Sequence, residues 1–154
     1  METKTPQGFI VQAGKDRFNE QVSFLEGTFE CKVSSIDSRE GFCVFDTTKI
    51  GKGPFYHFHY TQDEWFYILE GEFVFRIGDD ILKAKAGDSV FAPRLIPHAF
   101  TKVSEGNARM LVMYQPAGTM EDFYLQVSKL KNGIMRDFEN LYRSHGMEIV
   151  GPPL

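Results

Sequence analysis

The sequence predicts a mostly-β fold, a small antiparallel barrel or sandwich followed by two α-helices. Three observations predict it. Apolar segments of about five to nine residues, rich in Phe, Val, Tyr and Ile, fill residues 28–116, turn residues separate them, and the pattern changes to helical spacing after Pro116. The chain has 154 residues, so we expect one domain over residues 1–154, with a barrel core at about 28–116 and a helical C-terminal segment at about 119–146.

Turn residues divide the predicted core into strands. The breaks lie at residues 37–41, 49–54, 61–63, 70–71, 78–80, 86–88 and 104–107. Alternation is clearest at Phe73, Phe75 and Ile77, which predicts a hairpin that turns at residues 78–80. We also expect an N-terminal strand near residues 9–13, paired with an edge strand of the same subunit or of a second copy.

Two helices are expected after the core. Thr119 is placed to cap the first, whose opening turn carries Glu121 and Asp122, acids that suit the positive end of a helix. The second is expected over residues 136–145, with Gly146 as its stop. The apolar residues at helical spacing are Phe123, Val127 and Leu130 in the first helix and Phe138, Leu141 and Tyr142 in the second.

Composition excludes several classes of protein. The chain carries 17 Lys and Arg against 21 Asp and Glu, without a basic cluster, which argues against a nucleic-acid partner. The longest apolar run, residues 65–69, is too short to span a membrane, and residues 1–6 lack a signal pattern, so we expect a cytoplasmic protein. Cys31 and Cys43 are expected to be buried free thiols. The 15 Phe, 6 Tyr and 1 Trp indicate a thick core that could surround an apolar pocket.

Three of the four histidines fall in two short windows. On a strand, His57 and His59 project from the same face, and the strand after the next turn could return the carboxylate of Glu64 beside them. His98 ends the second window and could supply a third imidazole. Three imidazoles and one carboxylate form a ligand set for a divalent transition metal, with one or two positions left for water or substrate. The fourth histidine, His145, is expected to be a solvated residue at a helix end.

The two windows resemble the paired motifs of the cupin superfamily. The motif G-x5-HxH-x4-E-x6-G is met at every fixed position, by Gly51, His57, His59, Glu64 and Gly71. The motif G-x5-PxG-x2-H-x3-N is met by Gly87, Pro93 and His98, whereas Leu95 replaces the usual Gly and Lys102 the usual Asn. The resemblance implies an all-β cupin jelly-roll β-barrel that forms a homodimer and binds one metal ion through His57, His59, Glu64 and His98.

A narrower resemblance points to a reaction. Residues 63–72, 91–94, 97–100, 115–118 and 151–154 resemble small single-domain cupins of the quercetin-dioxygenase-like group. This resemblance implies a metal-dependent dioxygenase that opens the ring of an aromatic or enolic, flavonol-like small molecule with dioxygen. Glu64 would then be catalytic, assisting deprotonation of the substrate. Fe, Ni and Mn are the metals expected first, and the ligand set also accepts Zn.

Two questions stay open at the level of sequence. The candidate pocket residues are Phe55, Phe66, Phe100, Met110, Val112 and Tyr114, for which simple core packing is an equal alternative. The alternative functions are a non-catalytic cupin that binds a small molecule, and a metal-dependent isomerase or decarboxylase. A basic residue that faces the metal would favour small carboxylates, and Arg76 and Arg94 are the nearby candidates.

Overall fold

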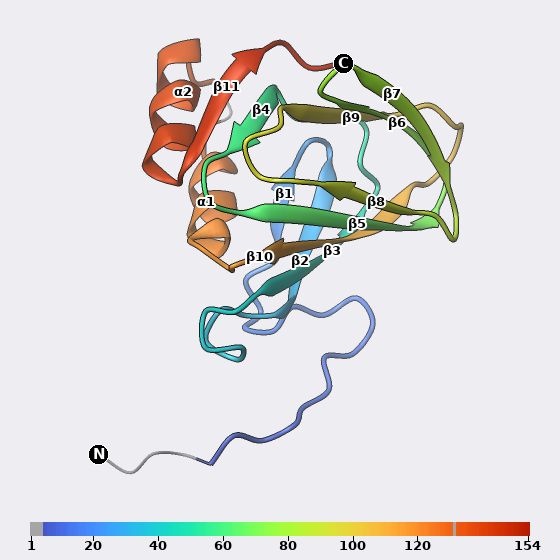
Figure 1. Ribbon diagram of the computed structural model, residues 1–154. Coiled ribbons are helices and arrows are strands. Elements are labelled where there is room, and N and C mark those ends of the chain that lie inside the picture. Colours follow the sequence, from blue (N-terminus) through green and yellow to red (C-terminus); the bar gives the residue numbers. More distant parts are fainter. Residues whose placement is uncertain (1–4, 131) are drawn as a thin grey trace.

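The computed structural model describes residues 5–130 and 132–154. Two antiparallel sheets lie face to face, and two helices close one end of the sandwich (Figure 1). The six-stranded sheet contains, in spatial order, β1 (Val22–Phe24), β2 (Gly27–Val33), β3 (Cys43–Thr48), β10 (Arg109–Gln115), β5 (Asp63–Glu70) and β8 (Ser89–Ala92). The five-stranded sheet contains β11 (Met147–Gly151), β4 (Tyr56–His59), β9 (His98–Lys102), β6 (Glu72–Ile77) and β7 (Asp80–Lys85). The predicted all-β jelly roll with C-terminal helices is confirmed.

Side-chain alternation explains why the two sheets pack together. In β5, Phe66 and Ile68 are fully buried, and in β6 the same holds for Phe73 and Phe75, while the residues between them are more exposed. The ring of Phe66 lies 5.0 Å from that of Phe75 across the sandwich. Each such buried ring contributes about 1.5–3 kcal/mol to folding. The predicted hairpin is also present, because β6 pairs with β7 and Ile77 lies opposite Asp80.

Both predicted helices form, although the first ends before Leu130. Helix α1 spans Met120–Val127, directly after Thr119, and α2 spans Met135–Ser144. Gly146 ends α2 with a φ of +76°, a conformation that glycine adopts without strain. The chain then forms β11, a strand that was not predicted. β11 pairs with the outer edge of β4 and so holds this strand in place. β4 carries two of the candidate ligands, His57 and His59.

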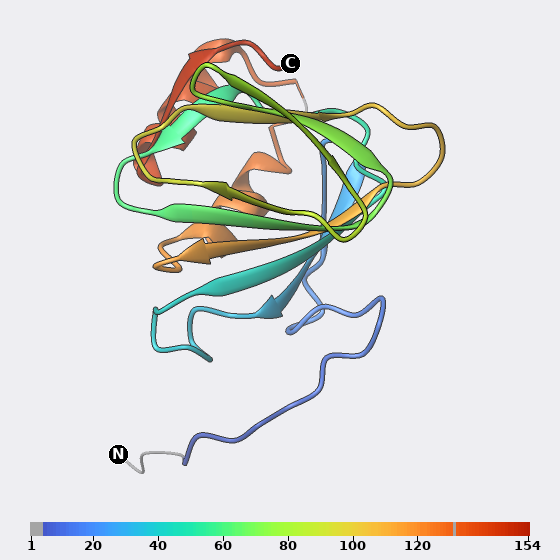
Figure 2. The same ribbon diagram turned by 45° about the vertical axis from the view of Figure 1, so that its right-hand side comes forward.

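The expected N-terminal strand does not form within the chain, so the predicted pairing with an edge of the same subunit is wrong, and pairing with a second copy stays a prediction. Residues 9–13 form no strand, and both ribbon views show the segment before β1 running away from the barrel (Figure 2). The physical reason lies at the free edge of β2. There the amide of Cys31 donates to the Asp16 carboxylate at 2.7 Å, and its carbonyl accepts from the amide of Arg17 at 2.8 Å. The backbone groups of Cys31 that an added strand would use are therefore already paired.

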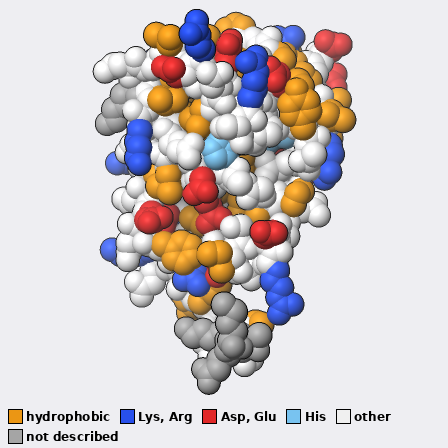
Figure 3. Space-filling view, turned by 90° about the vertical axis from the view of Figure 1, so that its left-hand side faces the viewer, with side chains coloured by type: hydrophobic (Ala, Val, Ile, Leu, Met, Phe, Trp, Pro, Cys, Tyr) orange, Lys and Arg blue, Asp and Glu red, His pale blue; other side chains and the backbone are white. Residues whose placement is uncertain are grey.

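The surface and the cysteines agree with the composition. On the face shown in Figure 3, Lys and Arg side chains are scattered and form no single basic patch. Neither helix of the described chain has the length and hydropathy that a bilayer crossing requires. Cys31 and Cys43 are free and buried, as predicted.

Candidate metal centre

The fold brings the four predicted ligands together between the two sheets. His57 and His59 lie on the same face of β4, and His98, at the start of β9, pairs directly with His57. Glu64 reaches them from β5 in the other sheet. All four side chains are buried, and each offers one ligand atom within 4.8 Å of the others. The cluster could therefore hold a metal ion.

Hydrogen bonds prepare two of the imidazoles for coordination. Nδ1 of His57 lies 2.6 Å from the carbonyl oxygen of Phe55, and Nδ1 of His98 lies 3.2 Å from that of Ile96. A carbonyl oxygen only accepts hydrogen bonds, so both Nδ1 atoms carry hydrogen. In the neutral imidazole this leaves the lone pair on Nε2, the atom that faces the cluster.

His59 has the same tautomer, but here a side chain rather than a main-chain carbonyl determines it. Its Nδ1 lies 2.7 Å from Oε1 of Gln62, whose amide nitrogen donates to the carbonyls of Pro116 and Ala117 at 2.8 and 3.0 Å. Nε2 of His59 is the one buried side-chain nitrogen or oxygen among the described residues that lacks a hydrogen-bond partner. A buried unpaired nitrogen is costly, and a metal ion would satisfy it.

The protonation states of Glu64 and His57 also suit metal binding. Burial acts to raise the pKa of Glu64, but the imidazoles of His98 and His59, which lie against its carboxylate, outweigh it and hold that pKa well below its usual range. Burial, with the neighbouring imidazoles, lowers the pKa of His57, so this ring is neutral. Carboxylate and neutral imidazole are the forms that bind metal.

The distances inside the cluster suit a metal. Oε2 of Glu64 lies 2.6 Å from Nε2 of His98 and 3.2 Å from Nε2 of His59. Ligand atoms bound at about 2.1 Å and at right angles to one another lie about 3 Å apart. Nitrogen and carboxylate oxygen are ligands that Fe, Mn, Ni and Zn all accept, so the predicted metals fit this set and none is selected by it.

A small cavity of about 30 Å³ adjoins the cluster and is lined by His57 and Glu64. Of the six predicted pocket residues, Phe100, Val112 and Tyr114 line it. The other three do not, because the alternation identifies inward-facing residues but not their height along the barrel. Phe66 and Met110 are fully buried in the core, and Phe55 packs against the rings of Phe138 and Tyr142.

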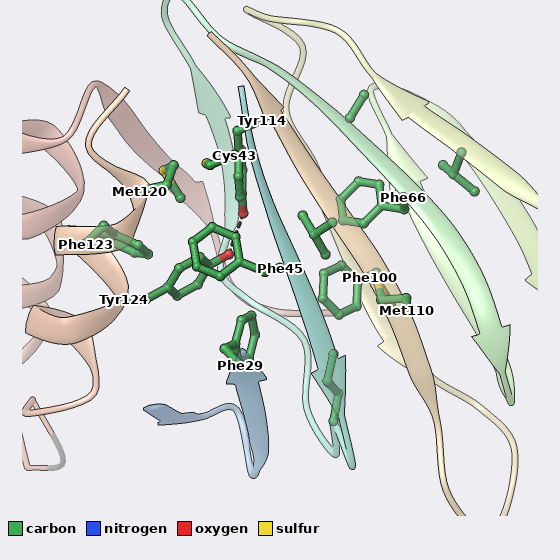
Figure 4. Packing of buried hydrophobic residues seen from close by; sticks show 14 of the residues in the cluster. Phe29, Cys43, Phe45, Phe66, Phe100, Met110, Tyr114, Met120, Phe123 and Tyr124 are labelled. Carbon is green, nitrogen blue, oxygen red and sulfur yellow. Dashed lines mark hydrogen bonds between the residues drawn. The ribbon is translucent and has the colours of Figure 1, made fainter. Parts of the chain in front are cut away.

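The helices supply a roof over the cavity, and none of its residues was among the six predicted pocket residues. Met120, Phe123 and Tyr124 of α1 and Tyr142 of α2 line the cavity. In Figure 4 the α1 side chains point toward the barrel, where the hydroxyls of Tyr114 and Tyr124 share a hydrogen bond. Helical spacing marked Tyr142 as facing the core, but nothing in a helix pattern tells which part of a barrel that face covers.

The tyrosines are neutral, and one hydroxyl is free. Burial is the main cause that raises the pKa of Tyr114, Tyr124 and Tyr142. The Tyr142 side chain is 2% exposed and its ring packs edge-on against His57 at 5.5 Å. Among the described residues its hydroxyl has no hydrogen-bond partner, in contrast to the bonded pair of Tyr114 and Tyr124.

The two arginines considered above lie elsewhere. Arg76 stacks on the ring of Tyr56 at 4.3 Å, and Arg94 pairs with Asp63 at 2.9 Å. Neither lines the cavity, and no Lys or Arg occurs among the described residues that do. A small carboxylate would find no cationic side chain among them.

The departures from the second motif leave the cluster intact. Leu95 takes a φ of +69°, the conformation that the usual glycine would adopt, and its side chain is exposed. Its amide donates to the carbonyl of His59 at 2.8 Å. Lys102, the last residue of β9, donates to the carbonyl of Gly106.

The fourth histidine lies outside the cluster. His145 follows the last residue of α2, and its ring forms hydrogen bonds with Thr119 and Gln126.

Comparisons with known proteins agree with this architecture. A family model described as a cupin domain matches residues 47–114, which include the whole cluster. An uncharacterized protein of Methanocaldococcus jannaschii is 29% identical over 73 residues, 47% of this chain, and the match spans 58% of the relative's length.

Solved structures share the fold. A predicted oxalate decarboxylase of Thermotoga maritima superposes with a TM-score of 0.57 at 19% identity, over 63% of this chain and 90% of that one. The polyketide cyclase RemF of Streptomyces resistomycificus gives 0.56 at 20% identity, over 71% and 79%. Identities this low show the fold alone, so the narrower resemblance to the quercetin-dioxygenase-like group stays a prediction. The family model, which covers residues 47–114, agrees with the two motif windows, so this central part of the chain matches a cupin domain, and the solved structures show the same fold.

Proposed function

We propose that the chain is a metal-dependent oxygenase that acts on a small aromatic or enolic molecule. One observation carries the proposal: the cluster of His57, His59, Glu64 and His98 adjoins a cavity walled by aromatic and aliphatic side chains, with no cationic side chain among the described lining residues. Such a wall suits a planar, uncharged ring that carries a hydroxyl or carbonyl group. Apart from the metal, an anionic group would find no cationic partner among the described lining residues.

The residues of the site have distinct roles in this proposal. The three imidazoles and Glu64 hold the metal. A divalent transition metal, when bound, supplies Lewis acidity that lowers the pKa of a coordinated hydroxyl. Glu64 is a carboxylate and can accept the hydroxyl proton of the substrate. The unpartnered hydroxyl of Tyr142 can donate a hydrogen bond to a substrate oxygen. Both atoms of dioxygen enter the product when the ring opens, so the reaction needs no external reductant.

The roof controls access in this proposal. A cavity of about 30 Å³ holds one or two water molecules. A flavonol is much larger, so its entry requires the side chains of α1 and α2 to move outward. These same aromatic side chains then exclude water from the bound substrate.

The structural neighbours do not decide the reaction. One is described as a predicted oxalate decarboxylase and another as a polyketide cyclase, so the same fold accommodates different chemistry. For this chain, the described cavity wall has no Lys or Arg, so a small diacid such as oxalate would have only the metal as a cationic partner.

The test is oxygen uptake with a flavonol probe. Wild-type protein is loaded separately with Fe, Mn, Ni and Zn, and quercetin is supplied with and without oxygen. The matched variants are His57→Ala/His98→Ala, which removes two ligands, and His145→Ala, which removes the histidine outside the cluster. The proposal predicts ring-opened product and oxygen uptake in equal amounts, lost in the double variant and kept in His145→Ala. Turnover without oxygen would indicate an isomerase or a decarboxylase. Ligand-dependent thermal stabilisation without turnover would indicate a binding protein. Either result would contradict the oxygenase proposal.

A further inference from the structure

We propose that Gln62 is a positioning residue that sets the tautomer of His59 and ties this ligand to the segment leading into helix α1. Gln62 lies in the turn between β4 and β5, and its side chain is 7% exposed. Its amide makes three hydrogen bonds, one to His59 and two to the carbonyls of Pro116 and Ala117. The inference rests on metal binding by the cluster, which is part of the proposed function, and not on oxygenation.

The two carbonyls determine which way the amide of Gln62 faces. Only its NH₂ group can donate to Pro116 and Ala117, so Oε1 is the atom that meets the ring of His59. A reversed amide would place Oε1 against two carbonyl oxygens and its NH₂ group against the ring. Because Oε1 only accepts, Nδ1 of His59 carries hydrogen and Nε2 keeps its lone pair. This Nε2 is the unpartnered buried nitrogen that faces the cluster.

His59 differs from the other two histidines in this respect. The Nδ1 atoms of His57 and His98 meet main-chain carbonyls, which no substitution can remove. At His59 the same task falls to a side chain. A single substitution at Gln62 therefore alters one ligand and leaves the hydrogen bonds of the other two in place.

The contact also reaches the roof. Pro116 and Ala117 lie just before α1, the helix that contributes Met120, Phe123 and Tyr124 to the cavity wall. The fit is close, since a Cβ atom added to Gly118 would lie 2.8 Å from Nε2 of Gln62. Gln62 thus forms a continuous link of hydrogen bonds from a candidate ligand to the start of the roof helix.

A purely structural role would join the same two loops without acting on the metal site. It predicts that substitution of Gln62 lowers the melting temperature but leaves the tautomer of His59 and the metal affinity unchanged. The tautomer of His59 and the metal affinity therefore distinguish a positioning role of Gln62 from a purely structural one.

The experiment uses the full chain. The apo forms of the wild type, Gln62→Met and Gln62→Glu are compared by ¹⁵N NMR of the imidazoles, and zinc affinity is measured by competition with a chelator. Met fills a similar volume without an amide, whereas Glu keeps an oxygen that accepts from Nδ1. The matched control is Gln126→Met, which removes a Gln–His hydrogen bond of 3.1 Å at His145, outside the cluster.

The expected results differ between variants. Gln62→Met populates the Nε2–H tautomer of His59 and binds zinc about 10- to 100-fold more weakly, as is usual when the partner of a metal-binding histidine is lost. Gln62→Glu keeps the wild-type tautomer and recovers most of the affinity, and Gln126→Met matches the wild type. Gln62→Asn, whose amide is one methylene too short, should repeat the loss and replaces Gln62→Met if that variant does not fold.

Two outcomes would overturn the proposal: a folded Gln62→Met with the wild-type tautomer at His59, or one with wild-type zinc affinity. If the wild type itself binds no zinc, iron, nickel or manganese, the proposed function fails. The tautomer measurement needs no metal and still decides the role of Gln62.

Discussion

The carboxylate of Glu64 lies 2.6 Å from Nε2 of His98, although the two residues come from opposite sheets of the sandwich. The position of one sheet relative to the other therefore determines the geometry of the cluster. A metal held by both residues would cross-link the two sheets, and unfolding would have to break that link.

Metal should therefore stabilise the protein. At a free zinc concentration 100 times its Kd, binding adds about 2.7 kcal/mol to the free energy of unfolding. For a chain of this length this corresponds to a rise in melting temperature of about 5–10 °C. Thermal unfolding with and without zinc measures it. The rise should vanish in His57→Ala/His98→Ala and persist in His145→Ala, and an equal rise in both variants would place the metal outside the cluster.

Tyr142→Phe should not weaken the fold. The hydroxyl it removes makes no hydrogen bond to the described residues, so its loss should leave the stability of the apo protein about unchanged. Tyr124→Phe breaks the bond to Tyr114 and should cost about 1–2 kcal/mol. Urea denaturation of the two variants checks the contrast, which is contradicted if Tyr142→Phe is the more damaging change.

The same substitution tests substrate contact. If the free hydroxyl of Tyr142 binds a substrate oxygen, Tyr142→Phe should raise KM for a flavonol about 2- to 10-fold, the value of one hydrogen bond. Tyr67→Phe, on the outward-facing side of β5, serves as the control and should leave KM unchanged. An unaltered KM in Tyr142→Phe would remove this residue from the substrate site.

Leu95→Gly should stabilise the protein by about 0.5–1 kcal/mol. A left-handed backbone costs a leucine about 1–2 kcal/mol, and the greater freedom of glycine in the unfolded chain offsets part of that relief. Ile96→Gly, at a neighbouring position without a positive φ, should instead be destabilising. Urea denaturation compares the two, and a loss of stability in Leu95→Gly would show that its side chain makes contacts worth more than the strain.

The pair of Arg17 and Asp37 should make stability depend on pH. Burial acts to raise the pKa of Asp37, but hydrogen bonds from Arg17 and from the amide of Ser34 outweigh it and lower that pKa below its usual value. A lowered pKa in the folded state means that the carboxylate stabilises the fold above its unfolded pKa of about 3.9, and this contribution is lost as the pH falls through the folded pKa. Asp37→Asn should therefore be destabilising at pH 7 and have much less effect near pH 2. An equal loss of stability in Asp37→Asn at pH 7 and at pH 2 would contradict a lowered pKa of Asp37 in the folded protein.

Much of the fold could be predicted because strands in a sandwich alternate. Phe73 and Phe75 face inward as expected, and the turns at residues 78–80 and 86–88 fall where the sequence places them. The four cluster residues could be named because two short windows carry them at fixed spacing. The expected strand at residues 9–13 failed for a reason the sequence does not display, since Asp16 and Arg17 occupy the edge it would have used.

The cavity wall was harder to predict. Most of it comes from parts of the chain outside the two motif windows, and the position of Tyr142 depends on how α2 packs, which helical spacing does not specify. β11 was missed because its five residues follow a helix directly and end at Gly151. Both features lie around the cluster. The ligands could therefore be predicted from the sequence, whereas their surroundings became known only from the structure.

The most direct test of the account is metal analysis of protein purified without added metal and without nickel-affinity resin. We expect about one Fe, Ni, Mn or Zn ion per chain in the wild type and in His145→Ala, and none in His57→Ala/His98→Ala. A wild type that holds no metal even after reconstitution, or a double variant that holds as much as the wild type, would contradict the assignment of the cluster as a metal centre.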